Sequence, residues 1–498
     1  MQFNSLDYMI FFPIVLIVYF LIPDRVKYLW LLGASYYFYM CWNPLYVLLI
    51  LASTIITYAS GLLLERIKHS DNDELRRRQL KKIVVAVSII SNLGILFYFK
   101  YFGYGMELIS DVFKRLNISV NVPAFDIMLP VGISFYTFQA LSYTIDVYRD
   151  EIYAEKNFLR YALFVSFFPQ LVAGPIERSK NLMKQLAVPH KFSVDNFREG
   201  LLLILWGLFQ KIVIADRIAT FVDVVYANYT TYQGAYLIVA TVLFAFQIYC
   251  DFAGYSTIAM GSAKILGISL MENFDAPYLA VSVSDFWRRW HISLTSWFRD
   301  YLYIPLGGNR KGKIRKYLNI MVVFLVSGLW HGAKLSFVVW GGLNGLYQVI
   351  GDWLRPAKEK LSQKLHLNTN SLGHKIVSAF VTFVLVDFTW IFFRARSITG
   401  ALRIIKNMIT VFNPWVLFDG SMFECGVDEK NFHLAVISIV LLLIVDCFRK
   451  KKVRIREVIA RQDTWFRYAS IVFFILFLLV FGKYGPAYNA ANFIYFQF

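Results

Sequence analysis

The stretch LNIMVVFLVSGLWHGAKLSFVVWGG (318–342) is apolar enough to cross a lipid bilayer, yet it contains the titratable side chain of His331. An ionisable group at membrane depth is costly in free energy, and such groups mark functional sites more often than structural ones. Gly328 and Gly332 flank the histidine, so the backbone can bend or be approached closely where the imidazole projects. The stretch therefore predicts membrane-embedded helices with His331 as a candidate functional residue. The alternative is a core histidine that bonds a backbone carbonyl or a water molecule.

The composition of the whole chain extends this reading beyond one stretch. Of the 498 residues, 58% are apolar and only 17% are charged. Soluble domains usually contain about 25% charged residues. We therefore predict an all-α, polytopic integral membrane protein. The net charge of +18 lies in short basic blocks between apolar runs, which is the pattern of cytoplasmic loops and does not indicate nucleic-acid binding.

The apolar runs predict about eleven or twelve membrane spans of about 20 residues each. They lie at 8–22, 28–41, 44–64, 83–102, 127–147, 199–222, 234–261, 317–333, 334–353, 375–395, 430–447 and 465–482. A further apolar stretch, 161–176, contains two prolines and a glycine, and we expect it to be re-entrant. The first span has no basic leading region or cleavage site, so we expect it to be retained.

Four basic blocks orient the predicted spans. If all four are cytoplasmic, the spans between them alternate consistently and the N-terminus faces outward. The blocks are 65–82, 309–316, 355–364 and 448–456. No internal repeat and no soluble domain is visible, so residues 1–498 are predicted to form one membrane-embedded unit. It comprises N-terminal spans (1–126), a central core (127–353) and C-terminal spans (354–498).

The polar segment SDFWRRWHISLTSWFRDYLYIPLGGNRKGK (284–313) separates two of the apolar runs. With Ser284 as N-cap, its residues divide at helical spacing into an apolar and a polar face, which predicts an interfacial helix over 284–302. The apolar face comprises Trp287, Trp290, Leu294, Trp297, Phe298, Tyr301 and Leu302, and the polar face comprises Arg288, Arg289, Ser293, Thr295, Ser296, Arg299 and Asp300. His291 falls on the apolar face and is expected to point toward the membrane-embedded core. Two inward histidines from different segments indicate a functional site more strongly than either alone.

Two other features could contribute to such a site. The glycine-rich basic turn 307–313 could contact phosphates, or it could simply follow the positive-inside rule. Asp251 lies in an apolar span, where it could line a water-filled path, orient a catalytic group or pair with an arginine. The seven histidines include no pair four residues apart, and no metal site is predicted.

Several motifs, in order along the chain, resemble the membrane-bound O-acyltransferase (MBOAT) family. They are similar to its bacterial alginate O-acetylase branch, which also includes peptidoglycan and cellulose acetylation proteins. The motifs are LPVGISFYTFQALSYTIDVYR (129–149), FPQLVAGPI (168–176), DFAGYSTIAMGSAKILGISLMENFDAPYLA (251–280), FWRRWHISLTSWFRDYLYIPLGGNR (286–310), SGLWHG (327–332) and FIYFQF (493–498).

The resemblance implies a ring of tilted helices around a central tunnel, with re-entrant and interfacial helices. It assigns the catalytic histidine of a W-H-G motif to His331 and the histidine of an R-W-H-x-S-L motif to His291. In that setting we expect His331 to act as general base. Donor binding is expected from Arg288, Arg289, Trp290, Arg310 and Lys311. Tunnel-lining or orienting roles are expected for Asp251, Trp330 and Ser327.

The resemblance further implies an O-acetyltransferase of a bacterial cytoplasmic membrane that holds no bound cofactor and uses acetyl-CoA as donor. The acetyl group would cross the membrane to an extracytoplasmic SGNH-type transferase partner that modifies a polysaccharide or cell-wall glycan. One alternative is D-alanyl transfer to teichoic acids from a carrier-protein thioester. A transporter or flippase of an acylated or lipid-linked substrate is the alternative from another class.

Overall fold

A computed structural model describes residues 1–116, 130–172 and 174–484. The protein is 76% helical, and the described residues include no β-strand, which confirms the predicted all-α class. The terminal motif 493–498 and the start of the predicted span 127–147 lie outside the described residues.

In the part of the chain that the structure describes, six helices are long and apolar enough to cross a membrane. They are α3 (Tyr46–Lys68), α4 (Glu74–Lys100), α12 (Ala235–Ile265), α18 (Leu372–Arg394), α20 (Glu429–Lys450) and α22 (Thr464–Phe481). A shorter apolar helix, α1 (Leu6–Leu21), precedes them. The protein is therefore a multi-pass membrane protein, whereas the number of eleven or twelve crossings stays a prediction.

The chain divides into two compact units. Unit 1 comprises residues 1–204 and 256–271, and unit 2 comprises residues 205–255 and 272–498. The helices α10 (Val194–Leu208) and α12 therefore contribute residues to both units. The prediction of a single membrane-embedded unit is not tested by this division and stays a prediction.

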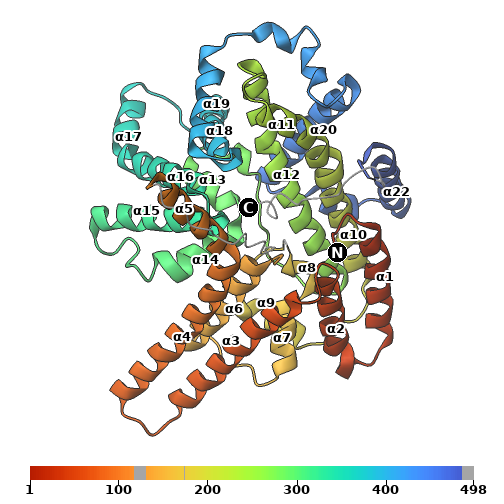
Figure 1. Ribbon diagram of the computed structural model, residues 1–498. Coiled ribbons are helices and arrows are strands. Elements are labelled where there is room, and N and C mark those ends of the chain that lie inside the picture. Colours follow the sequence, from red (N-terminus) through yellow and green to blue (C-terminus); the bar gives the residue numbers. More distant parts are fainter. Residues whose placement is uncertain (117–129, 173, 485–498) are drawn as a thin grey trace. The chain divides into compact units, whose positions relative to one another are not determined.

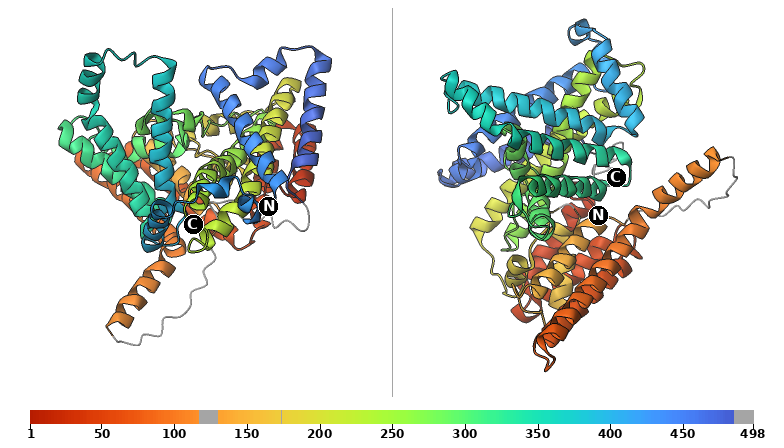
Figure 2. Two further views of the ribbon diagram at one scale, coloured as in Figure 1. Left: turned by 90° about the horizontal axis from the view of Figure 1, so that it is seen from above. Right: turned by 90° about the vertical axis from the view of Figure 1, so that its left-hand side faces the viewer.

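Unit 1 is built around the antiparallel helices α3 and α4, which lie side by side in Figure 1. The segment between them is the basic block 65–82, and Asp73 caps the start of α4 by accepting a hydrogen bond from the backbone N–H of Arg76. The other helical segments are α1, η1 (Asp24–Val26), α2 (Lys27–Met40), α5 (Phe102–Arg115), α6 (Ile133–Tyr148), α7 (Phe158–Ser166), α8 (Phe168–Leu171) and α9 (Ser179–Leu186). Helix α5 projects away from the α3–α4 pair in both panels of Figure 2.

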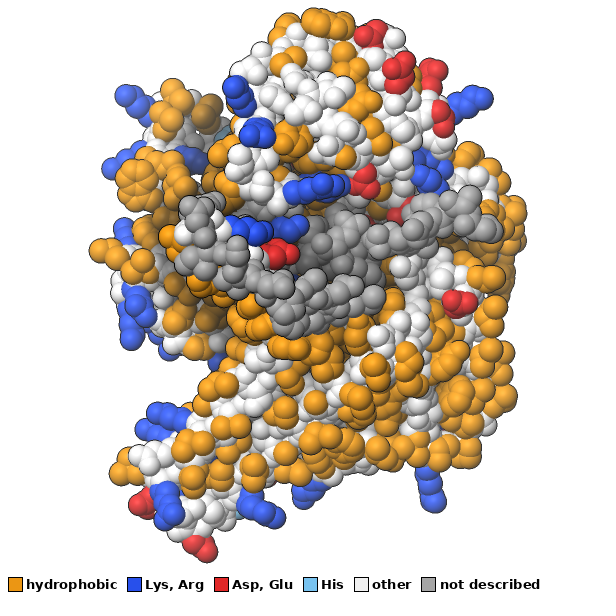
Figure 3. Space-filling view, in the orientation of Figure 1, with side chains coloured by type: hydrophobic (Ala, Val, Ile, Leu, Met, Phe, Trp, Pro, Cys, Tyr) orange, Lys and Arg blue, Asp and Glu red, His pale blue; other side chains and the backbone are white. Residues whose placement is uncertain are grey.

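The packed face of α3 is small and polar, while its other face is apolar. Ser53 donates a hydrogen bond to Asn92 of α4 (2.5 Å), and Gly61 admits the ring of Tyr143 from α6 so closely that a Cβ would lie 2.6 Å from the phenol oxygen. Small and hydrogen-bonding residues are what helix interfaces in a membrane use. Hydrophobic side chains cover the outer surface of this hairpin, and Lys and Arg gather at its tip (Figure 3). This pattern is that of a lipid-facing surface that ends in a polar loop.

Two predicted apolar stretches are interrupted helices. Within the stretch 161–176, Phe167 separates α7 from α8. The helix is therefore broken where we expected a re-entrant segment. The predicted span 199–222 is α10, then the π-helix η2 (Phe209–Ala215), then α11 (Asp216–Ala227). π-helical turns widen a helix locally and are common at functional sites.

Unit 2 contains the elements that carry both histidines. The central ones are α13 (Val283–Arg289), α14 (Ile292–Phe298), the π-helix η4 (Arg299–Tyr303), α15 (Gly312–His331) and α16 (Leu335–Trp353). The others are η2, α11, the unit 2 residues of α10 and α12, η3 (Pro277–Leu279), α17 (Arg355–Lys364), α18, α19 (Ile398–Thr410), η5 (Pro414–Leu417), η6 (Ser421–Glu424), α20, α21 (Ile455–Ala460) and α22.

Helices α15 and α16 form a tight antiparallel pair, side by side in Figure 1. Their backbones approach through glycines: a Cβ on Gly328 would lie 2.3 Å from the carbonyl oxygen of Phe337, and one on Gly341 would lie 2.2 Å from that of Phe324. Real Cβ atoms do not come this close, so both positions need glycine. Only three residues, 332–334, join the two helices.

Candidate active site

His331 is the last residue of α15, and its side chain is buried, with 4% of its surface exposed. The helix ends there because the backbone of Gly332 is extended, and the N–H of Gly332 closes the last turn on the carbonyl of Gly328. A Cβ on Gly332 would lie 2.4 Å from the ring of Phe337. The expected close approach of the backbone around the imidazole is therefore confirmed.

Three aromatic rings surround the His331 imidazole edge-on. The ring centroids of Trp330, Trp340 and Phe393 lie 4.9, 5.0 and 5.4 Å from that of His331, with interplanar angles of 81°, 87° and 73°. These residues come from α15, α16 and α18, so three helices together form the wall of the site. The result is a histidine in a mainly aromatic, water-poor setting.

Two indole N–H groups in this wall have no acceptor among the described residues. Trp390 stacks on Trp340, with centroids 5.7 Å apart and planes at 22°, and both side chains are buried. Neither Nε1 atom has a hydrogen-bond partner in the described part of the chain. Buried polar groups in proteins are almost always paired, so these two donors are available to the acceptor atoms of a bound molecule.

His291 lies between α13 and α14 with a φ angle of 44°, in the left-handed region that a non-glycine residue rarely adopts. The prediction of a continuous helix over 284–302 is therefore wrong. The N-cap of α13 is Ser282, not Ser284, because the Ser282 side chain accepts a hydrogen bond from the backbone N–H of Asp285. The expected inward direction is confirmed, because only 1% of His291 is exposed.

The helix breaks at His291 because the loop before it supplies hydrogen bonds to both new helix ends. The carbonyl of Arg289 accepts from the N–H of Asp275 (2.9 Å). The N–H of Ile292 donates to the carbonyl of Asn273 (2.9 Å), and the N–H of Ser293 donates to its side chain (3.3 Å). Helix-end groups that would otherwise lack partners are thus satisfied by tertiary contacts. Asn273 was not predicted, and no local pattern marks it.

Trp330 connects the two histidines. Its ring centroid lies 4.9 Å from that of His331 and 6.0 Å from that of His291. On its other side, His291 packs edge-on against Phe252 of α12, with centroids 4.6 Å apart. The structure therefore brings the two predicted histidines into one cluster, and it gives the predicted orienting residue Trp330 a contact with each.

Asp251, the residue before Phe252, takes part in a buried ion cluster. Lys211 of η2 lies 2.5 Å from the Asp251 carboxylate and 2.9 Å from that of Asp216, and all three side chains are buried. Of the alternatives for Asp251, pairing with a cation is the one observed, and the cation is a lysine and not an arginine. Lys211 and Asp216 were missed, although their charges within an apolar run were the signal that could have revealed them.

The other predicted residues lie in different surroundings. Arg289 forms ion pairs with Asp275 and Asp285, and Trp290 is buried among aromatic rings, including that of Trp390 at 5.2 Å. Ser327 is buried on α15, one turn before His331. The exposed residues are Arg288, Arg310 and Lys311, the last two in the turn before α15. Donor binding by these side chains stays a prediction.

Fold and site together define a helical membrane protein with a buried pair of histidines in an aromatic wall. The model of the membrane-bound O-acyltransferase (MBOAT) family matches residues 36–384, which is most of the chain and includes both histidines. The chain belongs to this family and is a membrane-embedded acyltransferase.

The relatives with similar sequences carry names that describe three different functions. A probable alginate O-acetylase of Pseudomonas aeruginosa is 37% identical over 82% of this chain and 74% of its own. A peptidoglycan O-acetyltransferase of Helicobacter pylori is 32% identical over 80% and 78%. A teichoic acid D-alanyltransferase of Streptococcus thermophilus is 28% identical over 53% and 68%. The similarity to the two acetylases covers more of the chain.

Proposed function

We propose that this protein is an O-acetyltransferase that takes an acetyl group from acetyl-CoA on the cytoplasmic side of a bacterial cytoplasmic membrane. The acetyl group then reaches an extracytoplasmic polysaccharide or cell-wall glycan, by way of an SGNH-type partner. The names of the two acetylase relatives support the transferred group and the class of acceptor. The family supports the acyl-transfer chemistry.

His331 is the proposed general base. A neutral imidazole accepts the proton of the acceptor hydroxyl as that oxygen attacks the thioester carbonyl, and a C–O bond forms while the C–S bond breaks. The thiolate that leaves takes up a proton and departs as free CoA. The observation that carries this role is the burial of His331 beside the Trp340 indole, which stacks on Trp390. The N–H groups of both indoles have no acceptor among the described residues.

The same indoles suggest how negative charge is stabilised. In acyl transfer the carbonyl oxygen gains charge in the transition state, and donors placed around it beforehand lower the barrier. The Trp340 N–H belongs to a ring whose centroid is 5.0 Å from that of His331, so donor and base lie in one wall. His291, which contacts Trp330 and Phe252, is the proposed second functional histidine. The exposed Arg288, Arg310 and Lys311 are the proposed contacts for the donor's phosphates.

The test is release of free CoA thiol from acetyl-CoA by purified full-length protein, with and without a candidate extracytoplasmic partner. We expect turnover in the wild type and a loss of about 100-fold or more in His331→Ala, within the range that positioned proton transfer contributes. The matched control is His374→Ala, which removes an exposed imidazole and should leave turnover unchanged. Undiminished turnover in folded His331→Ala would exclude His331 as the base.

The second candidate function is D-alanyl transfer, which the 28% identity to a teichoic acid D-alanyltransferase favours. Consumption of a D-alanyl carrier-protein thioester, with no turnover of acetyl-CoA, would select it. Because the chain belongs to an acyltransferase family, the alternative function of a transporter or flippase is disfavoured.

A further inference from the structure

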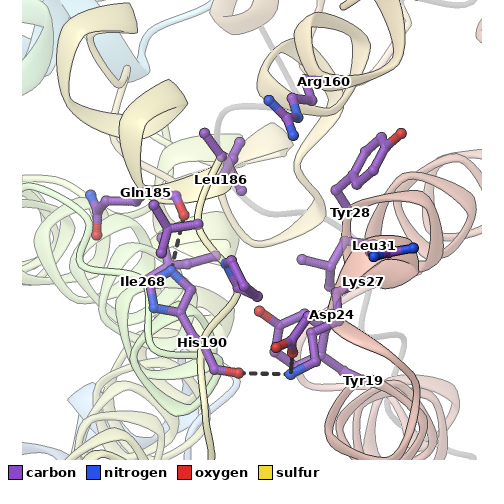
Figure 4. A pocket seen from close by; sticks show the side chains of 14 residues that line it. Tyr19, Asp24, Lys27, Tyr28, Leu31, Arg160, Gln185, Leu186, His190 and Ile268 are labelled. Atoms are coloured by element: carbon purple, nitrogen blue, oxygen red, sulfur yellow. Dashed lines mark hydrogen bonds and ion pairs between the residues drawn. The ribbon is translucent and has the colours of Figure 1, made fainter.

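Unit 1 contains a cavity of about 210 Å³ that the histidine chemistry does not use (Figure 4). It is formed by the end of α1, the start of α2, the first turn of α7 and the segment that follows α9. Its charged and polar lining includes Asp24, Arg25, Lys27, Tyr28, Arg160 and His190.

The lining has an excess of positive charge. Three cations face one carboxylate, and that carboxylate, Asp24, is held by Lys27 at 2.7 Å. The Lys27 ammonium also donates to the backbone carbonyl of His190 (3.0 Å), as Figure 4 shows. Neither Arg25 nor Arg160 forms an ion pair with a residue that the structure describes. The cavity therefore has two guanidinium charges that its one carboxylate does not balance.

Arg160 is positioned before any ligand binds. Its guanidinium lies over the ring of Tyr28, 5.5 Å from the centroid, and its Nε is buried with no acceptor among the described residues. Stacking on an aromatic face restricts a side chain that would otherwise lose much rotamer entropy on binding. The planar fork of an arginine matches two oxygens of a phosphate.

The opposite wall is also held in place. His190 Nε2 donates to the carbonyl of Gln185 (2.9 Å), and the Gln185 side chain in turn bonds both the N–H and the carbonyl of Ser269 (2.8 and 3.0 Å). Gly267 has a φ angle of 87° and packs so closely on His190 that a Cβ there would lie 2.7 Å from the histidine Cβ. Binding to such a preformed wall costs little ordering entropy.

The cavity lies at the basic end of unit 1. Lys68, the last residue of α3, pairs with Asp150 in the loop that leads to α7 and Arg160, so this end also contains the block 65–82. By the positive-inside rule it is the cytoplasmic end. Leu21, Val26 and Leu29 are exposed apolar residues beside the cavity, where α1 ends and α2 begins. A charged pocket bordered by lipid-facing side chains is suited to a lipid head group.

We propose that this cavity binds the phosphate group of an anionic phospholipid from the cytoplasmic leaflet, with Arg25 and Arg160 as its main contacts. The size of the cavity supports a head group: sites for complete small molecules usually measure about 300–1,000 Å³. The acyl chains would then lie along α1 and α2, outside the cavity. This site is in unit 1, whereas both histidines are in unit 2.

The test is binding to full-length protein in a neutral detergent. Phosphatidylglycerol and phosphatidylcholine are titrated in mixed micelles, inorganic phosphate is titrated alone, and affinity is measured together with the rise in melting temperature. We expect phosphatidylglycerol to bind. Arg25→Gln/Arg160→Gln should weaken it about tenfold or more, because both charged donors to the phosphate are lost.

The matched control is Arg66→Gln/Arg78→Gln, which removes two exposed arginines from the same end of unit 1. We expect it to bind like the wild type, because neither of these arginines lines the cavity. If the pocket variant fails to fold, Arg160→Lys retains the charge but loses the planar fork, and we expect it to bind several-fold more weakly.

Four results would each overturn the proposal. They are equal binding of phosphatidylcholine, binding of inorganic phosphate as tight as that of the lipid, an equal loss in the control variant, and unchanged binding in both pocket variants. Because the experiment measures lipid binding and not acetyl transfer, its result tests the lipid site independently of the proposed enzymatic function.

Discussion

His331 and His291 are both buried and both contact Trp330, but the chain places them by different means. His331 ends a regular helix and depends on the tight α15–α16 pair around it. His291 occupies a left-handed position between two short helices and depends on the hydrogen bonds that its chain neighbours form with Asn273 and Asp275. One histidine is therefore positioned mainly by local structure and the other by distant residues, so substitutions should affect them separately.

The largest effect is expected at the ion cluster that anchors the helix beside His291. Lys211 neutralises Asp251, and the next residue on α12, Phe252, packs on His291. In Lys211→Met two buried carboxylates lose their cation, which should lower the free energy of unfolding by about 3–5 kcal/mol. A melting temperature equal to that of Lys451→Met, an exposed lysine control, would contradict this expectation.

The second-largest effect is expected from substitutions that test whether His331 depends on the close α15–α16 pair. Two neighbouring glycines on α16 allow this test. A Cβ at Gly341 would lie 2.2 Å from a backbone oxygen of α15, whereas one at Gly342 would lie 3.6 Å from the nearest side-chain atom, on Leu325. Gly341→Ala should therefore push the helices apart, destabilise the protein by about 1–3 kcal/mol and reduce turnover. Gly342→Ala should change neither melting temperature nor turnover. Equal behaviour of the two variants would show that the close approach is unimportant.

A smaller effect separates the backbone of His291 from its imidazole. In His291→Ala the strained left-handed position remains, while His291→Gly relieves it, so the glycine variant should be the more stable by about 1 kcal/mol. Both variants lack the imidazole, and we expect both to lose turnover in the CoA-release assay. Recovery of turnover in His291→Gly alone would assign His291 a purely structural role.

The smallest effect is expected in unit 1, away from both histidines. Lys68 lies 2.8 Å from the Asp150 carboxylate and lowers the pKa of this group below its usual value. A lowered carboxyl pKa stabilises the fold above the unfolded-state value of about 3.9, and this contribution is lost as the pH falls through the folded-state pKa. Asp150→Asn should therefore cost less than about 1 kcal/mol at neutral pH, because the pair is exposed to solvent.

The difference between Asp150→Asn and the wild type should also disappear on acidification. Melting curves at pH 7 and at a pH below the folded-state pKa measure this, since a protonated carboxyl no longer attracts the lysine. Asparagine tolerates the left-handed backbone of Asp150, so the substitution isolates the charge. A difference that persists at low pH would indicate a cause other than the ion pair.

The predictions from sequence succeeded where periodicity and hydropathy act over one helix. The apolar runs around 44–64 and 234–261 correspond to α3 and α12, and both histidines are buried as expected. They failed where a distant segment competes with local helix formation. The residues 284–302 have a continuous amphipathic pattern, yet the chain breaks at His291 because Asn273 and Asp275 supply the hydrogen bonds that a continuous helix would have made internally.

By itself the sequence determined that this protein is a helical membrane protein of the acyltransferase family with His331 and His291 turned inward. Hydrophobicity and helical spacing are properties of contiguous residues, so they can be evaluated without coordinates. Only the tertiary structure decided that Trp330 contacts both histidines, that Lys211 neutralises Asp251, and that Arg25 and Arg160 share a cavity. These outcomes depend on contacts between residues far apart in the chain, and pairwise proximity of that kind is not encoded in any local pattern.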